Sequence, residues 1–377
     1  MNEQIIAPDL AITKPHFKVL DGLRGLAAVA VVIFHFMEIA VPDYNNSFIS
    51  HAYLAVDFFF CLSGFVIAYA YDHKMLKLGF KNFMKLRLIR LHPLVIIGSL
   101  IGLLVFVFDP FSQLYEKYIG QLPAMVLGSC FMIPYPVVPE RYFNLFHLNP
   151  PTWSLFWEYI ANIFYGLLLF KVSNKVLWIL TVIAAAALVF EAQRSGYLGV
   201  GWGGDNISGG SIRVFFSFLA GILVYRSKWV IQSGMNFMAV GILLLVVFMI
   251  PFSKSLNPFL EPAIVIFYFP FLVALGAGAG MKRKAGSATL SERICKFSGE
   301  ISYPLYMVHY PFIWMFMSYV EAKKPAMSEM MLITTIGTMI LVVFSYVVLL
   351  FIDEPVRQRL KHILIKDEMR RANRNRS

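Results

Sequence analysis

The first long apolar segment of the chain carries two side chains that could do chemistry, Arg24 and His35. They are eleven residues apart, so on an α-helix at 100° per residue they lie on one face. A rise of ~1.5 Å per residue separates them by about 16 Å along the axis. One helix face would then carry a cation at one end and a titratable base near the other. Two alternatives remain open: Arg24 could reach lipid headgroups, and His35 could be a packed histidine.

Two carboxylates are expected near the depth of His35 in a membrane. Asp57 and Glu158 each lie a few residues into later apolar segments that enter from the side on which the first segment ends. A carboxylate within hydrogen-bond reach would orient the imidazole and stabilise its charged form, as a general base requires. The alternative is three separate interfacial residues that face headgroups.

Paired arginines follow the second apolar segment. Arg87 and Arg90 share a helix face, at the end of a stretch, 72–91, that is otherwise rich in lysine. Planar guanidinium groups bind phosphate oxygens in two places at once, so the pair is typical of a phosphate site. An excess of basic residues that only sets membrane topology is the alternative.

A polar stripe marks the segment 301–320, where Ser302, Tyr306 and His309 follow helical spacing. His309 could line a passage or donate to a carbonyl beside Pro304. The three cysteines are far apart and form no metal-binding spacing, so no metal site is predicted.

The amino-acid composition indicates that these side chains lie in a membrane protein. The chain has 377 residues, is 58% hydrophobic and 15% charged, and has a mean hydropathy of +0.67. A soluble domain carries about 25% charged residues, so this is an integral, all-α membrane protein. Its net charge of +11 fits basic loops on one membrane side better than nucleic acid as a partner. About ten spans are predicted, near 19–40, 53–71, 92–109, 153–170, 176–190, 211–225, 229–250, 262–280, 301–320 and 330–352.

The lysines and arginines decide the orientation. If the proline-containing stretch 119–136 does not cross, 25 of the 33 basic residues fall on one side, which should be the cytoplasm. The stretch is therefore expected to be re-entrant or interfacial, and both termini cytoplasmic. We expect a cytoplasmic segment 1–18, one transmembrane domain 19–357, and a basic tail 358–377 that contacts anionic lipids.

Six of these segments, taken in order over residues 20–357, resemble the acyltransferase 3 family of membrane acyltransferases. They include LDGLRGLAAVAVVIFH (20–35), AVDFFFCLSGFV (55–66) and the Arg87–Arg90 pair. The others are WSLFWE (153–158), ISYPLYMVHYP (301–311) and DEPVR (353–357). Two departures matter: Tyr159 stands where many members have a second acid, and the tail carries no appended hydrolase-like domain, which implies a single-module enzyme.

The resemblance implies an O-acyltransferase of a bacterial inner membrane. Acetyl-CoA, or another acyl-CoA, would be held from the cytoplasm with its phosphates on Arg24, Arg87 and Arg90. His35 would act as the general base, oriented by Asp57 or Glu158, toward a hydroxyl of an extracytoplasmic glycan or lipid-linked sugar. Ser63 is the less favoured nucleophile of an acyl-enzyme route. Trp153, Tyr306 and His309 would line the substrate passage, and Arg213 would bind an anionic acceptor or a headgroup.

A transporter is the competing class, with His35, Asp57 and Glu158 as a proton relay. The absence of an internal repeat and the arginine pair count against it. The identity of the acceptor, the length of the acyl chain and the oligomeric state stay open.

Overall fold

The computed structural model describes residues 17–279 and 289–374, and its regular structure there is helical, with two isolated β-bridges and no strand. Seven helical stretches are long and apolar enough to cross a membrane, as judged by length and composition. They are Lys18–Ala40 (α2), Ala52–Tyr71 (η2 Ala52–Leu54 and α3 Ala55–Tyr71), Met75–Val107 (α4), Asn174–Ser195 (α8), Ile207–Arg226 (α9), Asn257–Gly278 and Met327–Lys366.

Shorter or more polar helices occupy the other three predicted spans. The segments 153–170, 229–250 and 301–320 contain Thr152–Leu167 (α7), Phe237–Phe248 (α10), and the pair Leu290–Val308 (α13) and Tyr310–Lys323 (α14). The stretch 119–136 holds only one turn of 3₁₀ helix and the ten-residue helix Leu122–Phe131 (α6), which follows Leu114–Tyr118 (α5). A span needs about 20 residues, so α6 is half as long as a crossing helix.

The predicted span 301–320 is not one continuous helix, because α13 and α14 meet at His309. Pro311 has no N–H to donate to the carbonyl of Met307, four residues earlier. The side-chain amide of Asn149 donates to that carbonyl instead, at 2.9 Å. The break is therefore stabilised from a separate loop.

The basic segment 72–91 is helical from Met75 onward and continues into the next span as α4, so Arg87 and Arg90 lie on a helix as expected. A kink at Gly79, whose φ of 73° suits glycine, separates its first turn from the rest. Arg87 and Arg90 therefore lie on a rigid helix.

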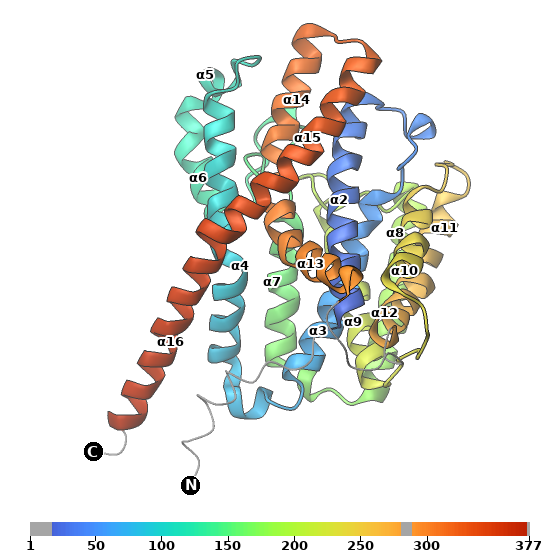
Figure 1. Cartoon of the computed structure of the whole chain (residues 1–377), viewed down its shortest axis with the longest axis vertical. Helices are drawn as coiled ribbons and strands as arrows, with labels where there is room; N and C mark the ends of the chain where they lie inside the picture. Colours follow the sequence, from blue (N-terminus) through green and yellow to red (C-terminus); the bar gives the residue numbers. More distant parts are fainter. Residues whose placement is uncertain (1–16, 280–288, 375–377) are drawn as a thin grey trace.

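At the other end of the chain, Met327–Val348 (α15) continues through a π-helical turn, Leu349–Asp353, into Glu354–Arg374 (α16). The helix runs through the predicted boundary between membrane domain and tail at residue 357. In Figure 1, α16 extends away from the bundle toward the lower end of the molecule. A second π turn, Ile264–Tyr268, joins Asn257–Ala263 (α11) to Phe269–Gly278 (α12).

Glycines allow the central helices to pack closely. A Cβ at Gly64 of α3 would collide with the carbonyl of Phe218 in α9, and one at Gly221 of α9 would collide with the carbonyl of Cys61. The same holds for Gly25 of α2 against the backbone of α13. Small residues of this kind let membrane helices approach backbone to backbone. Figure 1 shows α2 near the middle of the bundle with α13 crossing it.

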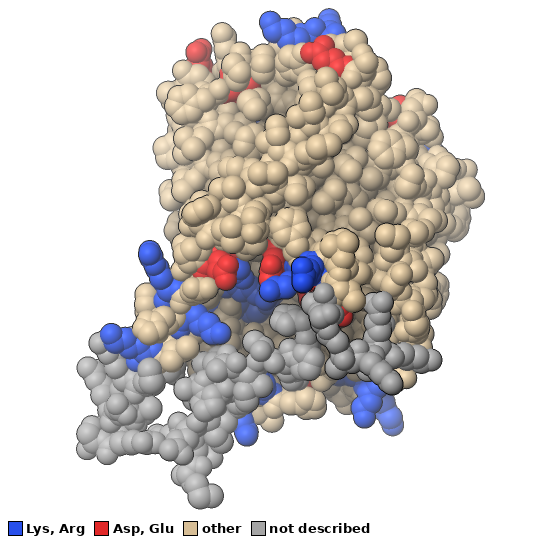
Figure 2. Space-filling view, viewed as in Figure 1, with Lys and Arg blue, Asp and Glu red and all other residues tan. Residues whose placement is uncertain are grey.

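Charged side chains on the visible face gather near its upper end and in its lower half, with a band of other residues between them (Figure 2). Such a band is what a bilayer requires of an embedded surface. The beginning of α2 and the end of α16 lie at the same, lower end of the molecule (Figure 1). Most of the predicted segment 1–18 lies outside the described residues.

Candidate functional site

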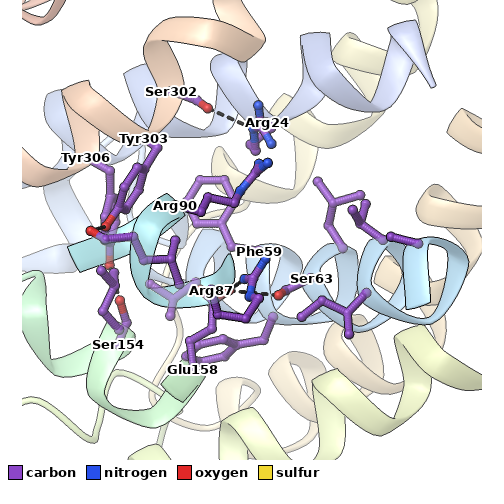
Figure 3. Close-up of a pocket in the computed structure, with 18 of the residues that line it drawn as sticks. Arg24, Phe59, Ser63, Arg87, Arg90, Ser154, Glu158, Ser302, Tyr303 and Tyr306 are labelled. Carbon is purple, nitrogen blue, oxygen red and sulfur yellow. Dashed lines mark hydrogen bonds and ion pairs between the residues drawn. The ribbon is translucent and has the colours of Figure 1, made fainter. Parts of the chain in front are cut away.

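A cavity of about 210 Å³ opens among α2, α3, α4, α7 and α13. Six polar or charged side chains of its lining come from five of the sequence segments singled out above. They are Arg24, Ser63, Arg87, Arg90, Glu158 and Ser302. Figure 3 shows Arg24 and Arg90 on one side, Ser63, Arg87 and Glu158 on another, and Ser154 with Tyr306 at one end. The structure therefore brings the three predicted phosphate-binding arginines together.

Arg24 is held by the helix that crosses α2. Its Nε donates to Ser302 Oγ at 2.8 Å, and its Nη2 donates to the carbonyl of Gly299 at 2.5 Å. Asp21 lies 3.7 Å away, one turn earlier on α2. These contacts fix the guanidinium at the cavity wall, so Arg24 does not snorkel freely to headgroups.

Glu158 binds Arg87 and Ser63 together. Its Oε1 accepts from Arg87 Nη2 at 2.9 Å and from Ser63 Oγ at 2.9 Å. The Nε of Arg87 is buried and has no hydrogen-bond partner among the described residues. The carboxylate that contacts Ser63 is therefore already paired with a guanidinium.

Arg90 makes no hydrogen bond or ion pair within the part of the chain that the structure describes, although Arg24, Arg87 and Arg357 are close enough to repel it electrostatically. Three guanidinium groups thus line a cavity whose lining contains one carboxylate, Glu158. An excess of positive charge around a cavity attracts an anion.

A row of aromatic rings leads from the cavity to His35. Phe59 and Tyr306 line the cavity and contact each other edge to face, with 5.8 Å between ring centroids. Tyr306 contacts His309 at 5.9 Å, and His309 stacks on His35 at 5.5 Å with 22° between the ring planes. Tyr306 also exchanges a hydrogen bond with Ser154 across 2.9 Å.

The partner of His35 is Glu38, neither Asp57 nor Glu158. His35 Nδ1 lies 3.0 Å from Glu38 Oε2, and the other carboxylate oxygen accepts from Tyr44 at 2.5 Å. The His35 side chain is 21% exposed, so its ring is accessible from outside the core. The predicted orientation by Asp57 or Glu158 is therefore wrong.

His309 is fully buried, and its Nδ1 lies 3.1 Å from the carbonyl of Leu305 and 2.9 Å from that of Tyr306. Carbonyls only accept, so the proton is assigned to Nδ1, and the ring donates to the backbone beside Pro304. Its Nε2 has no hydrogen-bond partner among the described residues.

Asp57 lies in a different site, where it pairs with Arg213. Two guanidinium nitrogens of Arg213 donate to the carboxylate, the shorter contact at 2.6 Å. Its Nη1 donates to the carbonyl of Val200 (2.8 Å) and its Nη2 to that of Tyr53 (3.0 Å), and its charge lies over the Trp153 ring at 5.5 Å. Arg213 and Asp57 are both buried. Arg213 is therefore not available to an acceptor or headgroup, and Trp153 packs under it away from the cavity lining.

The predicted cluster of His35, Asp57 and Glu158 is thus three separate sites, each with its own partners. The same separation removes the contacts on which a proton relay through the three groups depends. Among the described residues, no group of three His, Cys, Asp or Glu side chains could hold a metal ion.

Sequence reasoning missed Glu38 and Tyr44. Glu38 follows His35 by three residues, which is a contact spacing on a helix, so a local signal existed. Tyr44 lies beyond the helix end, and only the path of the loop brings its hydroxyl back.

A family model described as an acyltransferase domain, acyltransferase 3, matches residues 17–351. The chain is 31% identical over 192 residues to "Protein 2 in picA locus" of Rhizobium radiobacter, which covers 47% of this chain and 95% of that protein. No solved structure shows a significant match.

Two curated relatives carry acetyltransferase names. The peptidoglycan O-acetyltransferase OatA of Listeria monocytogenes is 25% identical over 365 residues, which is 90% of this chain and 55% of that protein. The O-acetyltransferase OatA of Staphylococcus aureus is 29% identical over 145 residues, 36% of this chain and 22% of that protein. The chain therefore spans about half the length of the Listeria relative.

Proposed function

The chain belongs to the acyltransferase 3 family, and on that premise we propose that it is a membrane O-acyltransferase that moves an acyl group, acetyl by preference, from acyl-CoA to a hydroxyl of a glycan or lipid-linked sugar. The observation that carries the proposal is the cavity lined by Arg24, Arg87 and Arg90 with one carboxylate, Glu158. Acyl-CoA carries several phosphate charges at one end and a thioester at the other, which suits a charged cavity followed by a row of aromatic rings.

The donor would bind with its phosphates on the arginines. Arg90 has no partner of its own among the described residues, so it is the guanidinium best placed to form new charge-assisted hydrogen bonds. The pantetheine arm would then extend along α2, past Phe59 and Tyr306, over the rise of about 16 Å between Arg24 and His35. Passage requires these two rings to move, because they contact each other edge to face.

His35 would be the general base. The acceptor hydroxyl oxygen forms a bond to the thioester carbonyl carbon, the carbon–sulfur bond breaks, and His35 takes the hydroxyl proton and passes it to the CoA thiolate. The neighbouring carboxylate of Glu38 favours this role for His35, because His309 has only carbonyls beside its Nδ1. Direct transfer is preferred to an acyl-enzyme at Ser63, whose hydroxyl is bonded to a carboxylate already neutralised by Arg87.

The names of the Listeria and Staphylococcus relatives support O-acetylation, and the first names peptidoglycan as the acceptor of that protein. For this chain we propose an extracytoplasmic saccharide or lipid-linked glycan as the class of acceptor. The arginine end would face the cytoplasm, both termini would lie there, and the protein would be a multi-pass protein of a bacterial inner membrane. The distribution of basic residues along the sequence supports that orientation.

The test uses the full chain in inverted membrane vesicles supplied with acetyl-CoA labelled in the acetyl group. Label should appear in glycan inside the vesicles, and His35→Ala at equal folded amount should lower transfer by about 10²–10⁴-fold. His362→Ala, on the exposed part of α16, is the matched control and should keep wild-type transfer. Full transfer by the His35→Ala variant would falsify the assignment of the base.

A further inference from the structure

We infer that Glu38 is the positioning residue of His35, and that Tyr44 holds Glu38 in place. The inference rests on the proposed function, because it assigns the residue through which the general base of that reaction is oriented. It stands on two hydrogen bonds, His35 Nδ1 to Glu38 Oε2 and Tyr44 Oη to Glu38 Oε1.

The first bond sets which nitrogen of His35 can act. An ionised carboxylate only accepts, so the proton of the neutral ring is assigned to Nδ1, 3.0 Å from Glu38 Oε2. The lone pair is then on Nε2, the nitrogen farther from Glu38, where a hydroxyl proton can be taken. Without Glu38 the ring can rotate or adopt the other tautomer.

The second bond fixes the carboxylate itself. Tyr44 belongs to the 3₁₀ turn Tyr44–Asn46, whose N-cap Asp43 accepts from the backbone N–H of Asn45 at 3.0 Å. The Tyr44 ring packs against Tyr53 and Phe34, with centroid distances of 6.2 Å and 5.9 Å. A loop outside the membrane span thus sets the position of a carboxylate in the last turn of α2.

The charge of the Glu38 carboxylate also supports its role beside His35. When His35 takes a proton it becomes an imidazolium, and a carboxylate at hydrogen-bond distance stabilises that cation. The carboxylates of serine hydrolase triads act on their histidines in this way, by orientation and charge rather than by taking the proton. Asp57 and Glu158 are each neutralised by an arginine, whereas Glu38 accepts only from Tyr44 and His35 within the described residues.

The experiment compares Glu38→Gln, Glu38→Ala and Tyr44→Phe in the full chain with acetyl-CoA as donor. Matched controls are Glu329→Gln and Tyr319→Phe, a second tyrosine–glutamate hydrogen bond near the junction of α14 and α15. We expect kcat to fall about 100-fold in Glu38→Ala and about tenfold in Glu38→Gln, within the range of general-base catalysis. Tyr44→Phe should fall about threefold and the controls less than twofold.

Two readouts separate positioning from loss of folding. The KM for acetyl-CoA and the thermal stabilisation by CoA should stay within about twofold of wild type, because the arginine cavity is about 16 Å along α2 from His35. The rate at which diethyl pyrocarbonate modifies His35, followed by peptide mass spectrometry, should fall at least about threefold in Glu38→Gln. A structural role alone would change folded yield and CoA binding instead.

If Glu38→Ala keeps kcat within twofold of wild type while His35→Ala abolishes transfer, the inference is overturned and the proposed function stands. If His35→Ala itself keeps transfer, the proposed function fails. A Glu38→Ala variant that loses CoA stabilisation together with kcat also overturns the inference.

Discussion

Arg213 and the three arginines of the cavity lie in opposite environments. Arg213 is buried and donates hydrogen bonds to Asp57 and to two backbone carbonyls. Arg24, Arg87 and Arg90 line a cavity with one carboxylate, and Arg90 has no partner in the described part of the chain. The residue type is the same, yet the first arrangement ties α3, α9 and the preceding loop together, while the second leaves donors for a ligand.

The difference shows how charge in a membrane protein divides between stability and binding. A buried ion pair with no exposed surface cannot bind a substrate, and removing one partner leaves the other charge buried and unpaired. A cavity with excess positive charge destabilises the empty protein by self-repulsion and is neutralised when an anion binds.

The largest expected effect comes from breaking the ion pair between Asp57 and Arg213. Arg213→Ala leaves Asp57 buried without a counter-charge, so the free energy of unfolding should fall by about 3–5 kcal/mol. Thermal unfolding in detergent and the yield of monodisperse protein measure this loss. The double variant Asp57→Leu/Arg213→Met should recover much of the stability, and wild-type stability in Arg213→Ala would contradict the role given to the pair.

Arg90→Ala tests the open arginines. Loss of one charge-assisted hydrogen bond to phosphate, worth about 1.5–3 kcal/mol, should raise the KM for acetyl-CoA by about 10- to 100-fold. Stability without ligand should stay the same or rise, because Arg24 and Arg87 lose a like charge. Arg194→Ala, an arginine paired with Glu191 at the end of α8, is the control. An unchanged KM with full CoA stabilisation would remove Arg90 from the donor site.

Ser63→Ala distinguishes direct transfer from an acyl-enzyme. Ser63 Oγ donates to Glu158, so its loss should cost one hydrogen bond of about 0.5–1.5 kcal/mol and change kcat by a few-fold only. Transfer of labelled acetyl and CoA stabilisation are measured together. Abolished transfer with CoA binding intact would instead support a covalent intermediate on Ser63.

Tyr306→Phe is expected to have the smallest effect. The change removes the hydrogen bond to Ser154 but keeps the ring against Phe59 and His309. We expect kcat within about threefold of wild type and a loss of about 1 kcal/mol of stability, measured by thermal unfolding. A much larger drop in kcat would assign the hydroxyl a direct part in transfer.

The helices, and the residues that share a helix, could be predicted from the sequence because they depend on local periodicity. Arg24 and His35 share α2, Arg87 and Arg90 both line the cavity, and the segments predicted to be apolar helices are helical. On a helix, the number of residues between two side chains fixes both the face that they share and their separation along the axis, so spacings of three and eleven residues can be interpreted directly.

What could not be predicted is pairing between distant segments. Asp57 and Arg213 are 156 residues apart, and Ser63 and Glu158 are 95 apart, so no spacing links them. Depth alone placed His35, Asp57 and Glu158 together, but side chains at one depth can still face different neighbours. Asp57 faces Arg213 and Glu158 faces Arg87, so neither carboxylate contacts His35.

The length of the continuous helix α15–α16 can be compared with the thickness of a bilayer. Residues 330–352 carry no charged side chain, and at ~1.5 Å per residue they extend about 35 Å, close to the ~30 Å of bilayer hydrocarbon. A crossing over these residues would place Glu329 and Asp353 at the two faces of the membrane. Asp353 and its ion-pair partner Arg357 are close enough to Arg90 to act on its charge. The arginine cavity would then be level with one face of the bilayer, where a water-soluble molecule could reach it without crossing hydrocarbon.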